Sequence, residues 1–336
     1  MVYANTLVKS LVFGILQTPF VAAAPPRSNP QGPARTIFQW ENGTWAENIA
    51  VRSNGDLLVT LMDRPELYSI SPKNQAANLV TDLEDEADAI GLLGITEMAH
   101  DVFVLVAGNF SIARAESDPA SYSVWEIDFN RGGKCEKVKE IERFPQASFL
   151  NGITTLNRQK KTVLISDSVL GVVWRLNTRT GEYVIALEDA TMKPPEGSKP
   201  YIGINGVRIF EDYLYYVNAQ RQLFCRVQID PSTGMARGPY EVIATEIAGD
   251  DFAISADGVA YVATNAENGL MRVTMGGNQT LIAGGLNSTV VAGATSAALG
   301  RTTKDEKIVY VVTSGAQALP VGGIYTEGGK VVAVPV

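Results

Sequence analysis

The chain has 336 residues, with 28 Lys and Arg against 36 Asp and Glu, giving a formal net charge of −8. Apolar residues make up 46% and charged residues 19%, a balance that supports a sizeable core and excludes a disordered chain. The acidic charge argues against a nucleic-acid partner, which requires clustered Lys and Arg, and against docking on an anionic membrane surface.

Histidine and cysteine are too scarce for several kinds of site. The single histidine, His100, excludes a His-rich metal site, and two cysteines, Cys135 and Cys225, are too few for a zinc ribbon or an iron–sulfur centre. No glycine-rich nucleotide motif follows a strand-like segment. We expect His100 in an exposed turn and both cysteines unpaired.

The N-terminus has the pattern of a secretory signal. Residues 1–24 combine Lys9, a short apolar run and small residues, and the pattern favours cleavage after Ala23. Residues 25–34 predict a flexible leader. Four N-glycosylation sequons agree with a secreted protein or passage through the secretory pathway, and they begin at Asn42, Asn109, Asn278 and Asn287. The apolar run is too short to span a bilayer, so we expect no membrane insertion.

A pattern of three or four strands recurs six times. Its most apolar strands are expected at 56–60, 102–106, 162–166, 213–217, 259–263 and 307–311, and strands with alternating polarity follow at 66–70, 123–127, 172–176, 223–227, 269–273 and 329–334. Six such repeats predict an all-β fold, a six-bladed β-propeller of four antiparallel strands per blade over residues 35–336. The sixth repeat lacks its last strand, which Arg35-Thr-Ile-Phe-Gln39 can supply to close the ring. We expect a monomer.

Polar residues begin most of the first strands, which line the channel of a propeller. Aligning the repeats places Glu47, Leu93, Asn151, Asn205, Asp250 and Ala292 at the leading position. The quartet Glu47, Asn151, Asn205 and Asp250 offers only hard oxygen ligands, so it predicts a site for Ca²⁺, or for Mg²⁺ or Mn²⁺. The alternative is that these side chains hydrogen-bond the backbone of turns.

Loops at the same end of the strands are expected to frame a small-molecule pocket, with His100 on the opposite face. The candidate catalytic hydrogen-bond donors are Tyr325, Arg64 and Asn218, with Asp250 on the channel floor. The candidate substrate-binding residues are Trp45, Met62, Phe110, Phe149, Asp167 and Thr264.

The quartet resembles that of the gluconolactonase, senescence-marker-protein and luciferin-regenerating family, which are six-bladed propellers with a central divalent metal. Glu47 matches the first-blade glutamate of that family, Asn151 and Asn205 match its asparagines, and Asp250 matches its metal-bound aspartate. In this chain Asp251 follows Asp250, where that family usually has glycine.

Longer runs resemble a fungal group of secreted propellers. These runs are Glu47-Asn-Ile-Ala-Val-Arg-Ser-Asn-Gly, Phe149-Leu-Asn-Gly-Ile, Ile165-Ser-Asp-Ser-Val-Leu-Gly-Val-Val-Trp-Arg-Leu, Asp250-Asp-Phe-Ala-Ile and Tyr325-Thr-Glu-Gly-Gly-Lys-Val-Val-Ala-Val. That group includes hetero-Diels–Alderases of tropolone–sesquiterpenoid biosynthesis. The resemblance implies joining of a tropolone-derived o-quinone methide to a humulene-type alkene.

Three functions therefore remain open. A cofactor-free cyclase would use a shaped pocket with hydrogen-bond donors. A metal-dependent lactonase would hold Ca²⁺ on the quartet and use Asp250 to move a proton. A propeller that only binds a small molecule is the third.

Overall fold

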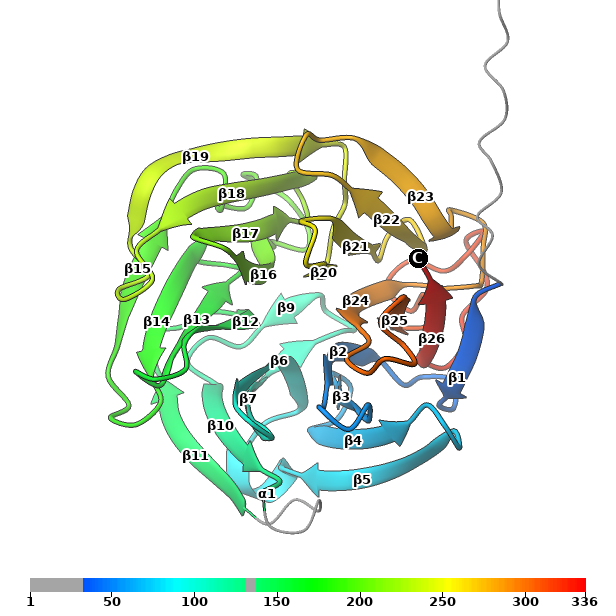
Figure 1. Cartoon of the computed structure of the whole chain (residues 1–336), viewed down its shortest axis with the longest axis horizontal. Helices are drawn as coiled ribbons and strands as arrows, with labels where there is room; N and C mark the ends of the chain where they lie inside the picture. The colour runs from blue at the N-terminus through cyan, green and yellow to red at the C-terminus, as the bar shows by residue number, and fades with distance from the viewer. Residues whose placement is uncertain (1–32, 131–136) are drawn as a thin grey trace, which may run out of the picture. The chain divides into compact units, whose positions relative to one another are not determined.

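A computed structural model describes residues 33–130 and 137–336, and these residues form one compact unit. Six four-stranded antiparallel sheets are arranged as blades around a ring (Figure 1). The all-β prediction is confirmed, since among the described residues the helix α1 (Glu84–Ala87) is a single turn. No helix in this part of the chain has the length and apolar character needed to cross a bilayer.

The first strand of each blade lies against the first strands of both neighbouring blades, so these strands line the central channel. They are β2 (Ala46–Val51), β6 (Gly91–Ala99), β12 (Leu150–Asn157), β16 (Ile204–Phe210), β20 (Phe252–Ile254) and β24 (Ala294–Leu299). The second strands are β3 (Leu57–Leu61), β7 (Val102–Gly108), β13 (Thr162–Asp167), β17 (Tyr213–Asn218), β21 (Ala260–Thr264) and β25 (Ile308–Thr313). They are almost completely buried, as expected for β-branched and aromatic strands packed on both faces.

The outer strands are more exposed and alternate in polarity. The third strands are β4 (Glu66–Ser71), β10 (Tyr122–Asp128), β14 (Val172–Asn177), β18 (Leu223–Ile229), β22 (Gly269–Val273) and β26 (Lys330–Pro335). The fourth strands are β5 (Ala76–Asp82), β11 (Lys137–Phe144), β15 (Tyr183–Glu188), β19 (Ala236–Thr245) and β23 (Gln279–Gly284), and β1 (Arg35–Gln39) completes the sixth blade.

The ring closes as predicted. β1 pairs antiparallel with β26, with Arg35 opposite Ala333 and Gln39 opposite Lys330 (Figure 1). Ile37 is only 3% exposed and packs with the core of blades 1 and 6. The N-terminal strand therefore covers the edge of β26 and buries apolar surface between the first and last blades.

A small hairpin interrupts the second blade. β8 (Phe110–Ser111) pairs with β9 (Glu116–Ser117) between β7 and β10, and β9 points toward the centre of the ring (Figure 1). The Ser117 hydroxyl contacts Ser148 O and the Tyr122 hydroxyl, so the hairpin is tied to the start of blade 3.

Candidate functional site

The predicted polar quartet lies where each first strand begins, and the backbone is irregular there. Three pairings of first and second strands shift register at these positions: β2–β3 at Glu47, β12–β13 at Asn151 and β16–β17 at Asn205. A bulge leaves its extra residues out of the ladder and turns their side chains away from the blade. This local geometry turns three members of the quartet out of the packing between strands, whereas the fourth, Asp250, lies in the segment before β20.

The sixth position of the ring was wrong in the sequence alignment. The β24–β25 pairing has its bulge at Thr295, and the β2–β3 pairing has its bulge at Glu47. Thr295 is therefore the residue of the sixth blade that corresponds to Glu47. Ala292 instead precedes a turn in which Gly293 has a φ of +64°, and a Cβ there would meet Ala316 N at 2.6 Å. In the sequence, Gly293 resembles the glycines that follow Asn151 and Asn205. For this reason the alignment of the repeats placed Ala292 at the leading position, three residues before Thr295.

Hydrogen bonds hold the carboxylates of the quartet. Asn205 Nδ2 donates to Asp250 Oδ1 at 2.6 Å, and Asn265 Nδ2 donates to Asp250 Oδ2 at 2.9 Å. Trp45 Nε1 donates to Glu47 Oε2 at 2.6 Å. Glu47, Asn151 and Asn205 are all at most 6% exposed. The carboxylate of Asp250 is thus fixed by amides from two blades.

Both acids are hard to ionise at this position. Burial, and then the charge of Asp250, raises the pKa of Glu47 well above its usual range, although the bond from Trp45 opposes the shift. Burial raises the pKa of Asp250 to about 7, helped by the charge of Asp251 and opposed by the two amide bonds. Near neutral pH the pair therefore retains a proton unless a cation compensates its charge.

The quartet has the donor chemistry for a hard cation. Two carboxylates and two side-chain amides supply only oxygen ligands, the set that Ca²⁺ prefers. Residues 33–130 and 137–336 contain no cluster of three or more His, Cys, Asp or Glu side chains, so amides would have to complete any such site. Glu47, Asn151, Asn205 and Asp250 are the side chains that could hold the ion.

A second polar layer lies directly behind the quartet, and sequence reasoning missed it. Asp251 Oδ2 accepts hydrogen bonds from Asn48 Nδ2 at 2.9 Å, Ser296 Oγ at 3.1 Å and Arg208 Nη2 at 2.6 Å. These partners come from blades 1, 6 and 4, and Asn48, Asp251 and Ser296 are buried. The departure at Asp251 from the usual glycine was the signal that could have revealed this layer.

Glycine occupies the same position in the other three blades because the neighbouring strand is too close for a side chain. A Cβ on Gly152 would lie 2.7 Å from Asn205 O, and one on Gly206 would lie 2.6 Å from Asp251 Cα. Gly94 lies equally close to the backbone of blade 3. The Asn-Gly pairs thus combine a channel-facing amide with tight contact between blades.

The four predicted apolar wall residues belong to one cluster at the same end of blades 1–3. Trp45, Met62, Phe110 and Phe149 share this cluster with Leu93. The rings of Phe110 and Phe149 stack at a centroid distance of 4.6 Å. Because Trp45 also donates to Glu47, the apolar cluster and the polar quartet meet at that indole.

The predicted rim residues lie in different environments. Arg64 is about one-third exposed and contacts Asp63, Glu66 and the Thr44 hydroxyl, so it lies beside Trp45. Tyr325 is 45% exposed and bridges to Val321 within the long loop 314–329. Val321 in turn packs against blade 6.

Three other predicted residues are fully buried and brace loops. Asn218 Nδ2 donates to Thr191 O and Lys193 O. Asp167 accepts the backbone N–H groups of Ser148 and Phe149, and Thr264 Oγ1 donates to Gly269 O. All three side chains therefore brace loops, and Asp167 holds the segment that carries the predicted wall residue Phe149.

The remaining predictions concern the surface. Asn42, Asn278 and Asn287 are exposed, whereas Asn109 is only half-exposed and its Oδ1 accepts the Ile90 N–H. His100 is exposed in the β6–β7 turn and Cys225 is buried with a free thiol. Residues 1–32, which include the predicted signal and most of the leader, lie outside the described residues, as does Cys135.

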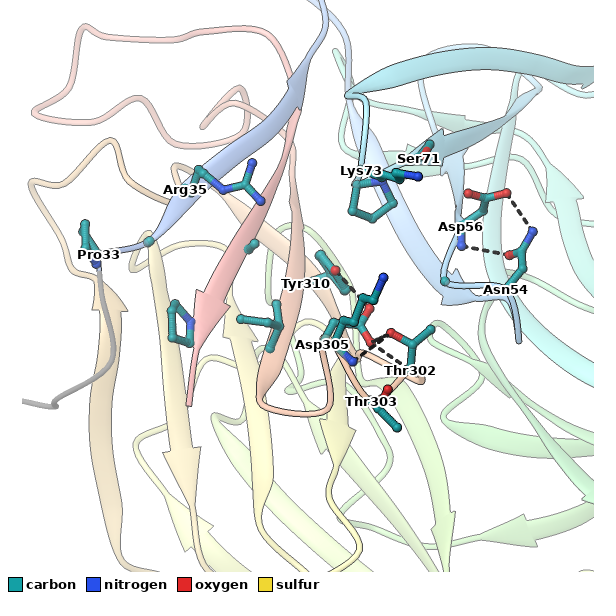
Figure 2. Close-up of a pocket in the computed structure, with 17 residues that line it drawn as sticks. Pro33, Arg35, Asn54, Asp56, Ser71, Lys73, Thr302, Thr303, Asp305 and Tyr310 are labelled. Atoms are coloured by element: carbon teal, nitrogen blue, oxygen red, sulfur yellow. Dashed lines mark hydrogen bonds between the residues drawn. The ribbon is translucent and has the colours of Figure 1, made fainter.

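A groove of about 970 Å³ lies away from the quartet, between blades 6 and 1 (Figure 2). Arg35 and Lys73 border it, and Asp305 on its wall is held by Thr302 and Tyr310. Residues of the β2–β3 and β24–β25 turns line this groove. These turns follow the ends of the first strands, whereas the quartet lies where the first strands begin, so the groove opens on the opposite face.

Comparison with known proteins gives two kinds of match. No protein-family model matches the sequence. A “Putative hetero-Diels-Alderase” from a Phoma species is 29% identical over 90% of this chain and 92% of its own length. The “Putative hetero-Diels-Alderase asR5” of Sarocladium schorii is 31% identical over 83% of this chain and 77% of its own length.

Solved structures match at the level of the fold. A calcium-binding regucalcin from Agrobacterium tumefaciens superposes with a TM-score of 0.61 at 15% identity, covering 90% of this chain and 93% of its own. A gluconolactonase from Xanthomonas campestris superposes with a TM-score of 0.58 at 12% identity, covering 90% and 89%. The chain thus belongs to the hetero-Diels–Alderase family that the two sequence relatives represent, on a six-bladed propeller of the regucalcin and gluconolactonase type.

Proposed function

We propose that the protein is a cyclase that catalyses an intermolecular hetero-Diels–Alder reaction. The substrates would be a tropolone-derived o-quinone methide, as the heterodiene, and an alkene of a humulene-type terpene. One C–C bond and one C–O bond form together, no atom leaves, and no electrons are exchanged with a cofactor. The observation that carries this proposal is the junction at Trp45, where a buried aromatic cluster meets a pair of carboxyl groups.

The aromatic cluster would supply the binding surface. Phe110 and Phe149 stack within the same buried cluster as Trp45 and Met62, an apolar environment that would suit a terpene and an unsaturated ring. Holding both partners in near-attack geometry lowers the entropic part of the barrier. The β8–β9 hairpin, tied to blade 3, positions Phe110 for this role.

The carboxyl pair would polarise the heterodiene. The raised pKa values of Glu47 and Asp250 keep a proton on the pair near neutral pH, so a carboxyl group can donate a hydrogen bond to the heterodiene oxygen. Such a bond strengthens as negative charge develops on that oxygen in the transition state. Arg64 and Tyr325 are the proposed donors at the rim, with Asn218, Asp167 and Thr264 supporting the loops.

The decisive experiment is an assay of Asp250→Leu and Tyr325→Phe, which each remove a donor, with a tropolone-derived o-quinone methide precursor and humulene. Loss of a donor that meets developing charge is expected to lower turnover by about 10²–10³-fold. Product yield and the stereochemical ratio over the uncatalysed background provide the readout. If wild-type protein leaves both at the background level, the proposed function is wrong.

A second candidate function is a metal-dependent lactonase, which the all-oxygen quartet favours. A bound divalent cation such as Ca²⁺ would polarise the ester carbonyl and acidify a water molecule. The four quartet residues, Glu47, Asn151, Asn205 and Asp250, would hold the ion, and Asp250 would also receive the proton. A purified protein that contains one tightly bound divalent ion per chain and hydrolyses lactones, with both properties lost in Asp250→Asn, would favour this function over the cyclase.

Binding without catalysis is the third candidate. It predicts saturable binding of the polyene or the tropolone partner with no product above background.

A further inference from the structure

The apolar surface that the proposed cyclase would use is covered in this structure. Trp45, Met62, Phe110 and Phe149 are each at most 8% exposed, and Glu47 is 5% exposed. A terpene that binds against these side chains must therefore reach a surface that solvent does not reach. Part of the protein has to move before such a substrate can bind, a requirement that rests on the proposed function.

The β8–β9 hairpin covers this aromatic cluster. Phe110 on β8 stacks on Phe149, and Ile112 in the turn packs against the same cluster. Arg114 and Glu116 on the hairpin are exposed, and β9 extends toward the centre of the ring (Figure 1). The hairpin thus has an apolar inner side on the cluster and a charged outer side in solvent, so it can move outward without displacing another element.

Few polar contacts anchor the hairpin. In the part of the chain that the structure describes, the hydrogen bond from Ser117 Oγ to Ser148 O is the one that joins the hairpin to another blade. The ion pairs of Arg114 are with Glu116 and Asp118, within the hairpin and at its base. These ion pairs therefore move with the hairpin and do not hold it on the cluster.

The backbone of this segment is also disfavoured. Ala115 in the turn has a φ of +52°, and Ala120 after β9 has a φ of +65°. Both lie in the left-handed region, which is unfavourable for alanine. The packing of Phe110 and the bond of Ser117 must offset this cost in the closed conformation. We propose that the β8–β9 hairpin is a gate, which moves off the aromatic cluster to admit an uncharged apolar ligand and closes over it.

Stopped-flow binding of the uncharged fluorescent probe N-phenyl-1-naphthylamine tests the gate. Because the probe binds only the open form, the observed rate should level off at the opening rate as probe concentration increases. Ser117→Ala removes the bond to Ser148 and raises the open fraction. The apparent affinity should therefore rise about two- to tenfold, with a higher plateau rate.

A matched control and a second readout complete the test. Thr178→Ala should bind the probe as wild type does, because Thr178 Oγ1 also donates to a backbone oxygen, Lys161 O, but away from the hairpin. Saturating probe should slow amide hydrogen exchange in residues 110–117. A rate without a plateau, Ser117→Ala with the affinity of the control, exchange that the probe leaves unchanged, or no probe binding would overturn the gate.

The gate and the proposed function can fail separately, since probe binding requires no turnover. If the probe results are as expected while wild-type protein gives no product above background, the gate is supported and the proposed function is wrong. If product forms while Ser117→Ala binds the probe like the control, the gate is wrong and the proposed function is unaffected.

Discussion

Asn205 Nδ2 lies 2.6 Å from Asp250 Oδ1, and this bond connects the first strands of blades 4 and 5 at the end of the channel. The residue after Asn205 is a glycine that packs against Asp251, and the residue after Asp250 is Asp251 itself. The dipeptides Asn205-Gly206 and Asp250-Asp251 thus orient the carboxylate of Asp250 and anchor the polar layer around Asp251. The proposed catalytic floor and the inter-blade packing are built from the same few residues.

The first prediction concerns pH and Asp250. Its pKa of about 7 in the folded protein exceeds the value of about 3.9 expected for an unfolded aspartate, so the folded state binds more protons between these values. The free energy of unfolding should therefore fall as pH rises from about 4 to 7, by at most about 1.4 kcal/mol per pH unit from this group. Asp250→Asn should remove that part of the dependence.

Urea unfolding of wild type and Asp250→Asn at several pH values in EDTA is the measurement. The difference between the two proteins isolates Asp250 from other titrating groups. Added Ca²⁺ should reduce the pH dependence of the wild type if the quartet binds the ion. Identical pH profiles for the two proteins would show that Asp250 ionises normally.

The second prediction concerns close packing between blades. Gly206→Ala places a Cβ 2.6 Å from Asp251 Cα, so the two strands must separate. The expected loss of stability is about 1–3 kcal/mol, accompanied by lower activity because Asp250 moves with its neighbour. Gly276→Ala is the control, since its Cβ would meet only Thr274 Oγ1 at 3.9 Å. Chemical unfolding should separate the two variants, and equal stability would contradict the packing argument.

The third prediction concerns ring closure. Ile37→Ala should cost about 2–5 kcal/mol, because Ile37 is 3% exposed in the core shared by the first and last blades. Thr36→Ala on the same strand is the control, because Thr36 is exposed. The free energies of unfolding of both variants provide the comparison. A loss below about 0.5 kcal/mol for Ile37→Ala would show that β1 contributes little to closure.

The fourth prediction concerns processing in the native host. The secreted protein should lack residues 1–23 or 1–24 and carry glycans at Asn42, Asn278 and Asn287, which are exposed. Asn109 should be modified least, because its side chain holds the Ile90 N–H. Intact mass before and after glycosidase treatment measures both features. An unmodified chain that retains Met1 would contradict the prediction.

Strand periodicity alone was sufficient to predict the blades. Alternating and β-branched segments such as 102–106 and 172–176 match β7 and β14, because local side-chain pattern determines which segments can be buried in stacked sheets. The missing strand of the sixth repeat similarly predicted the pairing of β1 with β26. The side chains of the quartet could be found because they recur at one position of a repeat.

Only the tertiary structure decided what depends on contacts between blades. The bulge that assigns Thr295 rather than Ala292 to the ring is a property of strand pairing, and Gly293 imitates an Asn-Gly pair while forming a turn. The Asp251 layer and the packing of the β8–β9 hairpin on the aromatic cluster join residues far apart in the sequence. Local pattern carries no information about these distances, because closure of the ring, not the individual strand, brings the residues together.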